Sequence, residues 1–404
     1  MSQKNDTFFV EKKEWSKTKD ELFGCYFKPY FSKIIHAKYP IVYVDCFAGK
    51  GKFDDGEDGS PLIALRIIDE ALESANIMPG LISTYFIDIN YASDLASNLP
   101  TSTSKRAIHI IDGAFEDEID KILSKVHKAN VFLYIDPYGI KALDVPKLRT
   151  ILRAFNLAGI EILINFNSFG FYRQACNVLR VKIDKSINDY SEFLVEYDES
   201  LVDSEEEMNR IFGSSSWKDI VYKCKRKEIT AFEAEIELSN EFCKNLQVGH
   251  SGFKYVLNMP LRKGDEVNPK YRMIHATNHA DGCLLMANNM YARSQTHRLN
   301  RLNGGMSLFE LDVNDNMTSP ELRTQELLSL IGDDEIEIRD LLCRYFLKFG
   351  IKSDSKGLIE LLKENEDKLI IRRIPETTSA NKPTSFWSPS TGKYLYLRRK
   401  PWKQ

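Results

Sequence analysis

Short apolar runs alternate with helical patterns along residues 41–166. Each run is nearly continuous in apolar side chains, and amphipathic spacing typical of helices fills the segments between runs. Runs of this kind indicate parallel strands that are buried on both faces of a sheet. We therefore expect an α/β domain with a mostly parallel sheet. The predicted strands are 41–46, 81–88, 107–112, 131–136 and 160–166, and the predicted helices between them are 60–74, 91–98, 116–128 and 145–156.

Three segments around this core have patterns of their own. Residues 14–39 show helical spacing interrupted at Pro29 and predict an N-terminal preface of one or two helices. Residues 253–261 and 271–277 predict two strands, and the Gly and Pro between them suit a hairpin loop, which places one antiparallel strand in the sheet. The long interruption at 167–252 contains helical patterns, and we expect a helical insertion that caps the active edge of the sheet.

The C-terminal part has the pattern of a separate module. The chain becomes polar and glycine-containing after Tyr291 and then resumes amphipathic helices, which predicts a domain boundary near 305–318. Helices followed by two strands, 369–374 and 394–399, resemble a winged helix. The expected parts are a helical preface at 1–40, a Rossmann-like domain at 41–305 with its insertion at 167–252, and a winged-helix-like module at 306–404.

The composition predicts a folded chain without metal or disulfide chemistry. Hydrophobic residues make up 43% and charged residues 28% of the 404 residues, which is close to the globular average. The seven cysteines include no CxxC pair, which argues against a disulfide framework and a cysteine zinc site. His275 and His279 have the spacing of helical metal ligands but lie in a predicted strand and its exit, so we expect no metal. No apolar run is long enough to cross a bilayer, and we expect a cytoplasmic protein.

Charge is distributed unevenly along the chain. The net charge of −3 provides no bulk attraction for nucleic acid, but residues 339–404 contain 15 Lys and Arg against 7 Asp and Glu. Aromatic residues lie among these basic ones, so the segment could contact both phosphates and bases. A solvated surface ribbon is an equally good explanation. The predicted substrate-binding residues are Arg372, Arg373, Arg398, Arg399 and Lys400.

Acidic residues stand at the ends of four predicted strands. The carboxyl ends of parallel strands open on the same edge of a sheet, where ligands bind at the switch in strand order. Four acids on that edge are hard to explain by packing and predict a ligand site. The four acids are Asp45, Asp88, Asp112 and Asp136.

The glycine turn after the first strand predicts a nucleoside cofactor. Glycine allows positive φ and lets bare backbone N–H groups approach a ligand's carboxylate or ribose. The pattern favours S-adenosylmethionine, with Asp45 holding the amino group of its methionine part directly or through water. A nicotinamide dinucleotide is disfavoured because Lys, Phe and Asp follow the second glycine where a third glycine is needed. A tight turn without a ligand is the other alternative. The predicted cofactor residues of the turn are Asp45, Phe47, Ala48, Gly49 and Gly51.

Two further acids continue the predicted cofactor site. Asp88 would accept both ribose hydroxyls, because a carboxylate offers paired acceptors. Asp112, followed by Gly113 and Ala114, would lie beside the adenine. The distance along the chain from the first acid to the second is longer than in the usual strand–helix–strand unit, and the excess falls in the loop at 53–61.

The sequence Asp136-Pro137-Tyr138-Gly139 carries the prediction about the reaction. A planar exocyclic amine is a poor nucleophile, and the Asp136 carboxylate with the Pro137 carbonyl can accept its hydrogens and favour a pyramidal nitrogen. Tyr138 could stack on a base brought out of its helix. Asn165, at the end of the next strand, would order the substrate or this loop, and a satisfied polar strand end explains it equally well. A strand followed by an ordinary proline turn is the alternative.

These motifs resemble the three-Cys-motif partner proteins (TcmP) over most of residues 10–300. The family name implies a partner that bears a cysteine motif, and this chain, which lacks CxxC, is similar to the methyltransferase-like member of the pair. The matching elements are the opening helix with Trp15, Lys19 and Leu22, the strand and turn at 43–49, and the segments 59–65, 135–139, 163–166 and 271–277 with Gly282 and Met286.

Two loops are similar to those of other methyltransferases. The Asp-Pro-Tyr-Gly loop is similar to the loop of guanine-N2 tRNA methyltransferases, and the glycine turn resembles that of DNA cytosine methyltransferases. No Pro-Cys nucleophile loop follows, which disfavours cytosine C5 chemistry. The loop also departs from the Asp-Pro-Pro-Tyr of adenine-N6 enzymes, so the target base stays open.

Together these patterns predict a class I S-adenosylmethionine-dependent methyltransferase that acts on an amino nitrogen of a nucleic-acid base, in DNA or RNA. The alternative is a methyltransferase-like module that recruits or regulates a three-Cys-motif protein without catalysing transfer. A nicotinamide oxidoreductase is a third, weaker hypothesis.

Overall fold

The chain forms two compact units that divide between Asn278 and His279. The domain boundary predicted at 305 lies outside the described residues, and the division seen here comes before helix α11 (Ala280–Leu302), which groups with the C-terminal residues. The computed structural model describes residues 6–12, 14–37, 39–74, 81–182, 202–261, 271–302, 319–378, 380–388 and 392–400.

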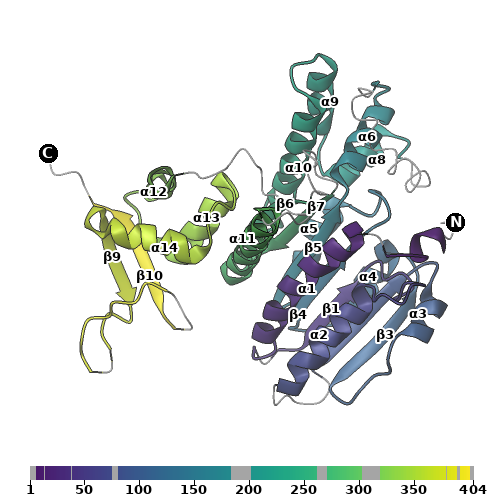
Figure 1. The fold of residues 1–404 in the computed structure, drawn as a ribbon, viewed down its shortest axis with the longest axis horizontal. Helices are drawn as coiled ribbons and strands as arrows, with labels where there is room; N and C mark the ends of the chain where they lie inside the picture. Colours follow the sequence, from purple (N-terminus) through teal and green to yellow (C-terminus); the bar gives the residue numbers. More distant parts are fainter. Residues whose placement is uncertain are drawn as a thin grey trace. The chain divides into compact units, whose positions relative to one another are not determined.

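The first unit contains a seven-stranded sheet in the order β3-β2-β1-β4-β5-β7-β6 (Figure 1). The strands are β1 (Ile41–Asp45), β2 (Ile82–Asp88), β3 (Arg106–Asp112), β4 (Asn130–Ile135), β5 (Gly159–Phe166), β6 (Tyr255–Leu261) and β7 (Tyr271–Thr277). Strand β7 pairs antiparallel with β5 and β6, and the other neighbouring pairs are parallel. The predicted mostly parallel sheet with one antiparallel strand is confirmed, and its order fits a Rossmann-like methyltransferase fold. The predicted hairpin loop at 262–270 lies outside the described residues.

Helices cover both faces of this sheet. They include α1 (Glu14–Ile34), α2 (Ser60–Ser74), α3 (Ala92–Asn98), α4 (Phe115–Leu123) and α5 (Val145–Ala154). Successive strand residues point to opposite faces. Tyr43 and Phe132 point toward α1, where the ring of Phe27 lies 5.1 Å and 5.2 Å from theirs. Val44 and Leu133 point to the other face and join the apolar cluster that includes α4 and α5. Figure 1 shows α1 and α2 in front of the sheet.

Of the one or two helices expected around Pro29, the structure has one, since α1 runs unbroken through that residue. An interior proline removes one backbone hydrogen bond and crowds the preceding turn. Burial of an aromatic face against the sheet offsets that loss, and α1 belongs to the same compact unit as the strands. The aromatic residues of this face are Phe23, Tyr26, Phe27, Tyr30 and Phe31, all of them buried.

The helices found in the predicted insertion extend the core of the first unit. The described ones are α6 (Ser168–Val178), α8 (Glu205–Phe212), α9 (Trp217–Lys225) and α10 (Ala231–Gln247). Helix α10 packs on α5, α6, β6 and β7, and Phe242 stacks on Phe166 of β5 with 4.6 Å between the ring centroids. Helices α6 and α10 thus lie against the sheet, and α8 and α9 pack on helices, whereas the sequence led us to expect a cap over the active edge of the sheet.

The second unit combines helices with a three-stranded antiparallel sheet in the order β8-β10-β9. Its core includes Leu341, Leu342, Leu358 and Leu397, which are all buried. The assignment of this unit to the winged-helix class stays a prediction. Besides α11, its elements are α12 (Pro320–Ser329), β8 (Ile336–Glu337), α13 (Ile338–Phe349), α14 (Ser355–Glu364), β9 (Leu369–Ile374) and β10 (Tyr394–Arg399).

Candidate functional site

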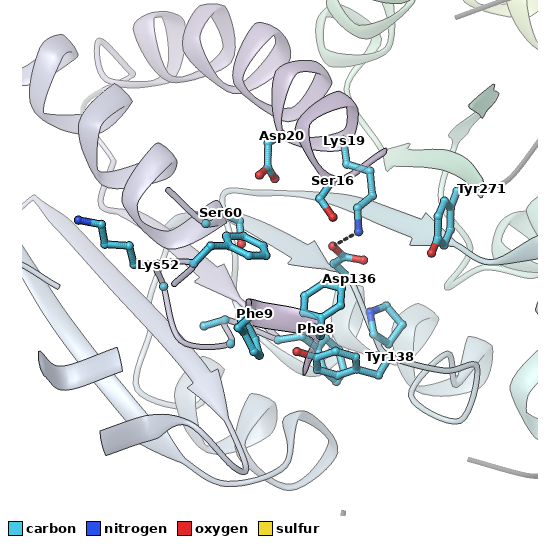
Figure 2. A pocket seen from close by; sticks show the side chains of 17 residues that line it. Phe8, Phe9, Ser16, Lys19, Asp20, Lys52, Ser60, Asp136, Tyr138 and Tyr271 are labelled. Atoms are coloured by element: carbon cyan, nitrogen blue, oxygen red, sulfur yellow. Dashed lines mark hydrogen bonds and ion pairs between the residues drawn. The ribbon is translucent and has the colours of Figure 1, made fainter. Parts of the chain in front are cut away.

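A cavity of about 70 Å³ opens at the carboxyl ends of β1 and β4 (Figure 2). The strand order reverses between these two strands, since β2 lies beside β1 and β5 lies beside β4, and open α/β sheets bind ligands at such a point. Residues from widely separated parts of the chain meet here. They are Phe8, Phe9, Ser16, Lys19, Asp20, Phe47, Ala48, Gly49, Gly51, Lys52, Phe53, Gly59, Ser60, Asp136, Pro137, Tyr138 and Tyr271.

The glycine turn forms one wall and needs its glycines. Gly49 has φ +59° and Gly51 has φ +75°, a region that side chains disfavour. A Cβ at Gly51 would also lie 2.9 Å from the side chain of Leu95. The backbone N–H of Gly49, which we expected to face a ligand, donates instead to Asp88 Oδ2 at 2.8 Å.

Asp45 is fully buried beneath this wall. Its carboxylate accepts from Ser60 Oγ at 2.7 Å and from the backbone N–H of Phe47 at 3.3 Å. Burial raises the pKa of Asp45 to about 7, although those two hydrogen bonds lower it. Ser60 lines the cavity and Asp45 does not, so Asp45 acts on the cavity through the Ser60 hydroxyl.

Asp88 is committed largely to the backbone. Besides Gly49, its carboxylate accepts from the N–H groups of Asn90 at 2.8 Å and Tyr91 at 2.9 Å. A carboxylate has about four acceptor positions, so only about one stays open for a ribose hydroxyl. Asp112 lies opposite Asp88 in the sheet and is exposed. The predicted ribose and adenine residues, Asp88, Asp112, Gly113 and Ala114, do not line the cavity.

The loop after β4 forms the opposite wall, and both oxygens of Asp136 are held. Asp136 Oδ2 accepts from Lys19 Nζ at 2.7 Å, and Oδ1 accepts from Asn165 Nδ2 at 2.6 Å. Asn165 thus makes the kind of contact expected of a residue that orders this loop, while its own buried Oδ1 has no hydrogen-bond partner among the described residues. Pro137 and Tyr138 line the cavity, and Tyr138 is 39% exposed. The structure therefore brings the glycine turn and the predicted reaction loop together.

The roof of the cavity comes from α1, to which sequence reasoning gave no chemical role. Ser16, Lys19 and Asp20 point into it from one side of the helix (Figure 2). Burial raises the pKa of Asp20 to about 6, against the opposing effect of Lys12, whose Nζ lies 2.7 Å from its carboxylate. The signal was present in the helix phase, because Lys19 and Asp20 precede buried Phe23 by four and three residues.

Two aromatic residues of the 3-10 helix η1 (Asp6–Phe9) close the cavity from the N-terminal side. The buried ring of Phe9 packs edge-on against Tyr91 at 4.9 Å and would lie 2.9 Å from a Cβ at Gly49. Phe8 packs edge-on against Tyr138 at 5.6 Å. The carbonyl of Phe9 accepts from the backbone N–H of Asp54 at 2.8 Å, which ties η1 to the loop after the glycine turn.

The predicted substrate-binding residues all lie on the β9–β10 ribbon of the second unit or directly after it. Arg372 pairs with Glu335 and stacks on Tyr396 at 4.3 Å, and Arg373 donates to the carbonyl of Phe386. Lys400 Nζ donates to the carbonyl of Asp367. The side chains of Arg398 and Arg399 are exposed.

The described residues contain no metal cluster and no membrane helix. They include no group of three or more His, Cys, Asp and Glu side chains that could hold a metal ion. His275 lies in a buried cluster, with Nε2 at 2.9 Å from Glu161 and 3.0 Å from Tyr26. Within the same part of the chain, every helix is too short or too polar to cross a bilayer.

No family model and no curated protein matches the sequence, so the resemblance to TcmP stays a prediction. Similar solved structures include the plantazolicin methyltransferase BamL with a triazolic analog and SAH, at 12% identity and TM-score 0.31, covering 68% of this chain and 90% of that one. The cyclopropane synthase MmaA2 from Mycobacterium tuberculosis has 9% identity and a TM-score of 0.30, and the match covers 73% of this chain and 81% of that one. Loganic acid methyltransferase with SAH has 10% identity and a TM-score of 0.29, and the match covers 99% of this chain and 98% of that one. Because these TM-scores are low, the fold assignment rests on the strand order.

Proposed function

We propose that this protein is an S-adenosylmethionine-dependent methyltransferase that acts on an amino nitrogen. One observation carries the proposal: a cavity with polar and aromatic lining at the β1–β4 switch point joins the glycine turn to the Asp136 loop. The residues present suit this cofactor, because the cavity has ammonium and hydroxyl donors beside buried carboxylates, which match a zwitterionic methionine end. When bound, the cofactor supplies a methyl group on a sulfonium.

The residues of the reaction loop orient the accepting amine in this proposal. Lys19 and Asn165 each occupy one position on the Asp136 carboxylate, and each oxygen keeps further acceptor capacity toward the cavity. Asp136 and the Pro137 carbonyl can therefore accept the hydrogens of an amine and direct its lone pair. Tyr138 at the rim provides a partly exposed ring on which a planar substrate can stack.

A nucleic-acid base is the substrate class that we propose within this function. Exposed Arg398 and Arg399 and the stacked Arg372–Tyr396 pair support it, because basic and aromatic side chains together bind phosphates and bases. We further propose a three-Cys-motif protein as partner, on the sequence resemblance alone.

A binding module without transferase activity is the second candidate, favoured by a specific observation. The ring of Phe9 packs on Gly49, and the N–H of Gly49 is bonded to Asp88. A turn satisfied in this way would need to reopen before its backbone contacts a cofactor. The module would keep the pocket for structure or sensing.

One pair of measurements separates these functions. Isothermal titration with S-adenosylhomocysteine tests the pocket, and methyl transfer from labelled cofactor to total cellular DNA and RNA tests the reaction. We expect binding and transfer by the wild type, and loss of transfer with retained binding in Asp136→Asn. Asp117→Asn, an exposed acid on α4, is the matched control and should keep both. No binding at all would overturn the proposal, and binding without any transfer would favour the module.

A further inference from the structure

Three polar residues of α1 form one face toward the cavity. Ser16, Lys19 and Asp20 are spaced i, i+3 and i+4, which places them side by side on a helix. All three line the cavity, and Figure 2 shows their side chains directed into it from α1. Their exposures are low, at 5% for Ser16 and 7% for Lys19. This polar face therefore continues the buried stripe of α1 beyond its aromatic part.

The hydroxyl of Ser16 is the group of this face that lacks a partner. It is buried, and no described residue forms a hydrogen bond with its Oγ. Buried polar groups in proteins are almost always hydrogen-bonded, since leaving one unsatisfied is unfavourable. A buried hydroxyl directed into a cavity is thus available to a ligand.

Lys19 and Asp20 place opposite charges beside that hydroxyl. An ammonium group has three donors, and Asp136 takes one from Lys19. The carboxylate of Asp20 lies on the same face, paired with Lys12. Across the cavity, Ser60 presents a second hydroxyl that is backed by Asp45. The cavity thus has donors for an anion and acceptors for a cation within one polar lining.

We propose that the α1 face binds an amino-acid zwitterion, which is the methionine end of the cofactor. Ser16 and Lys19 donate to its α-carboxylate, and Asp20 accepts from its α-ammonium. This assignment rests on the proposed function and adds binding residues from outside the glycine turn. Lys19 then contacts both the cofactor and Asp136, so cofactor binding and the order of the reaction loop are linked.

Two ligands that differ in the amino-acid part test the proposal by isothermal titration. S-adenosylhomocysteine carries the zwitterion, and 5′-methylthioadenosine keeps the adenosine but lacks it. Ser16→Ala should lower the affinity for S-adenosylhomocysteine about 3- to 10-fold, and Lys19→Met should lower it about 10- to 100-fold. These changes are expected for the loss of one neutral and one charged hydrogen bond. Binding of 5′-methylthioadenosine should change less than about 2-fold in both, because it makes neither contact.

Matched controls come from the same helix. Ser32 is exposed and its hydroxyl donates to the carbonyl of Lys28, which pairs with Glu70 far from the cavity lining. Ser32→Ala and Lys28→Met should leave both affinities unchanged. Thermal unfolding of each variant checks its fold, and Ser16→Thr, which keeps the hydroxyl, should restore most of the affinity lost in Ser16→Ala.

The outcomes separate this inference from the function beneath it. If Ser16→Ala and Lys19→Met lowered the affinities for both ligands equally, or changed neither affinity, the α1 assignment would be overturned, while a cofactor site would stay in place. Failure of both ligands to bind the wild type would overturn the proposed function itself. Binding of free L-methionine, without any binding of 5′-methylthioadenosine, would assign the face to a free amino acid and would overturn its assignment to the cofactor.

Discussion

Replacement of Asp45 by Asn tests whether the buried charge at the end of β1 destabilises the folded protein. Asp45 is fully buried, and burial raises the pKa of its carboxyl from 3.8 to about 7. Asn has the same shape: its Oδ1 can accept from the Phe47 N–H, while its Nδ2, in the place of Oδ2, can only donate to Ser60 Oγ, whose hydroxyl must then turn to accept. The substitution therefore removes the charge with little change in packing.

The magnitude and sign follow from the two pKa values. The folded state binds the proton more tightly than the unfolded state, so stability falls as pH rises from 3.8 through about 7. A change in pKa of this size corresponds to roughly 4 kcal/mol above the folded pKa, at about 1.4 kcal/mol per pKa unit. At about pH 5.5, the same relation gives a destabilisation of roughly 2 kcal/mol. The free energy of unfolding of Asp45→Asn, relative to that of the wild type, should thus rise by about 2 kcal/mol between about pH 5.5 and 8.5.

The assay must report on the first unit alone, since two compact units need not unfold together. Hydrogen exchange of peptides from β1 and β4, measured by mass spectrometry at both pH values, meets that need. Asp117→Asn on α4 is the control, and its difference from the wild type should not change with pH. An Asp45→Asn variant whose stability relative to the wild type is equal at both pH values would refute the reasoning.

Three further predictions concern other parts of the molecule. Phe9→Ala should destabilise the packing around Tyr91 and speed binding of S-adenosylhomocysteine in stopped-flow experiments, because the Phe9 ring covers Gly49; slower binding would contradict this. The double variant Arg398→Ala and Arg399→Ala should bind single-stranded nucleic acid more weakly, to the same degree for all sequences. In fluorescence anisotropy, the slope of log affinity against log salt concentration should fall by about 1.4. An unchanged slope would contradict binding of nucleic acid by the ribbon. Arg272→Met should lower the free energy of unfolding of the first unit by about 3–5 kcal/mol, because it removes the positive charge beside buried Glu235; hydrogen exchange of peptides from β7 would measure this.

The sheet could be predicted from the sequence because its strands are buried on both faces. Their apolar runs are nearly continuous, and the hairpin position of β6 and β7 placed the antiparallel strand correctly. The pattern around Pro29 left one or two helices open because local propensity disfavours a proline within a helix, and the aromatic face of α1 gains enough burial to keep the helix whole. Tertiary packing decided that element.

The α1 side of the cavity could not be predicted in the same way. Residues 16–21 are all polar, so the pattern gives no contrast between those that face inward and those that face water. Only the phase of the aromatic stripe behind them distinguishes Ser16 and Lys19 from exposed Lys17. Sequence motifs instead drew attention to Asp88, whose acceptor positions are mostly taken by the backbone.

Ligand recognition should therefore come from the groups that folding leaves unsatisfied. Many hydrogen-bonding groups of the glycine turn already have partners within the protein, since Gly49 donates to Asp88 and Asp45 accepts from Ser60. Among the described residues that line the cavity, the buried Oγ of Ser16 has no hydrogen-bond partner and can still bond to a ligand. Because an unsatisfied buried group is unfavourable until a partner arrives, a ligand gains most by bonding there. The turn then shapes the site, while α1 and the loop after β4 supply its selectivity.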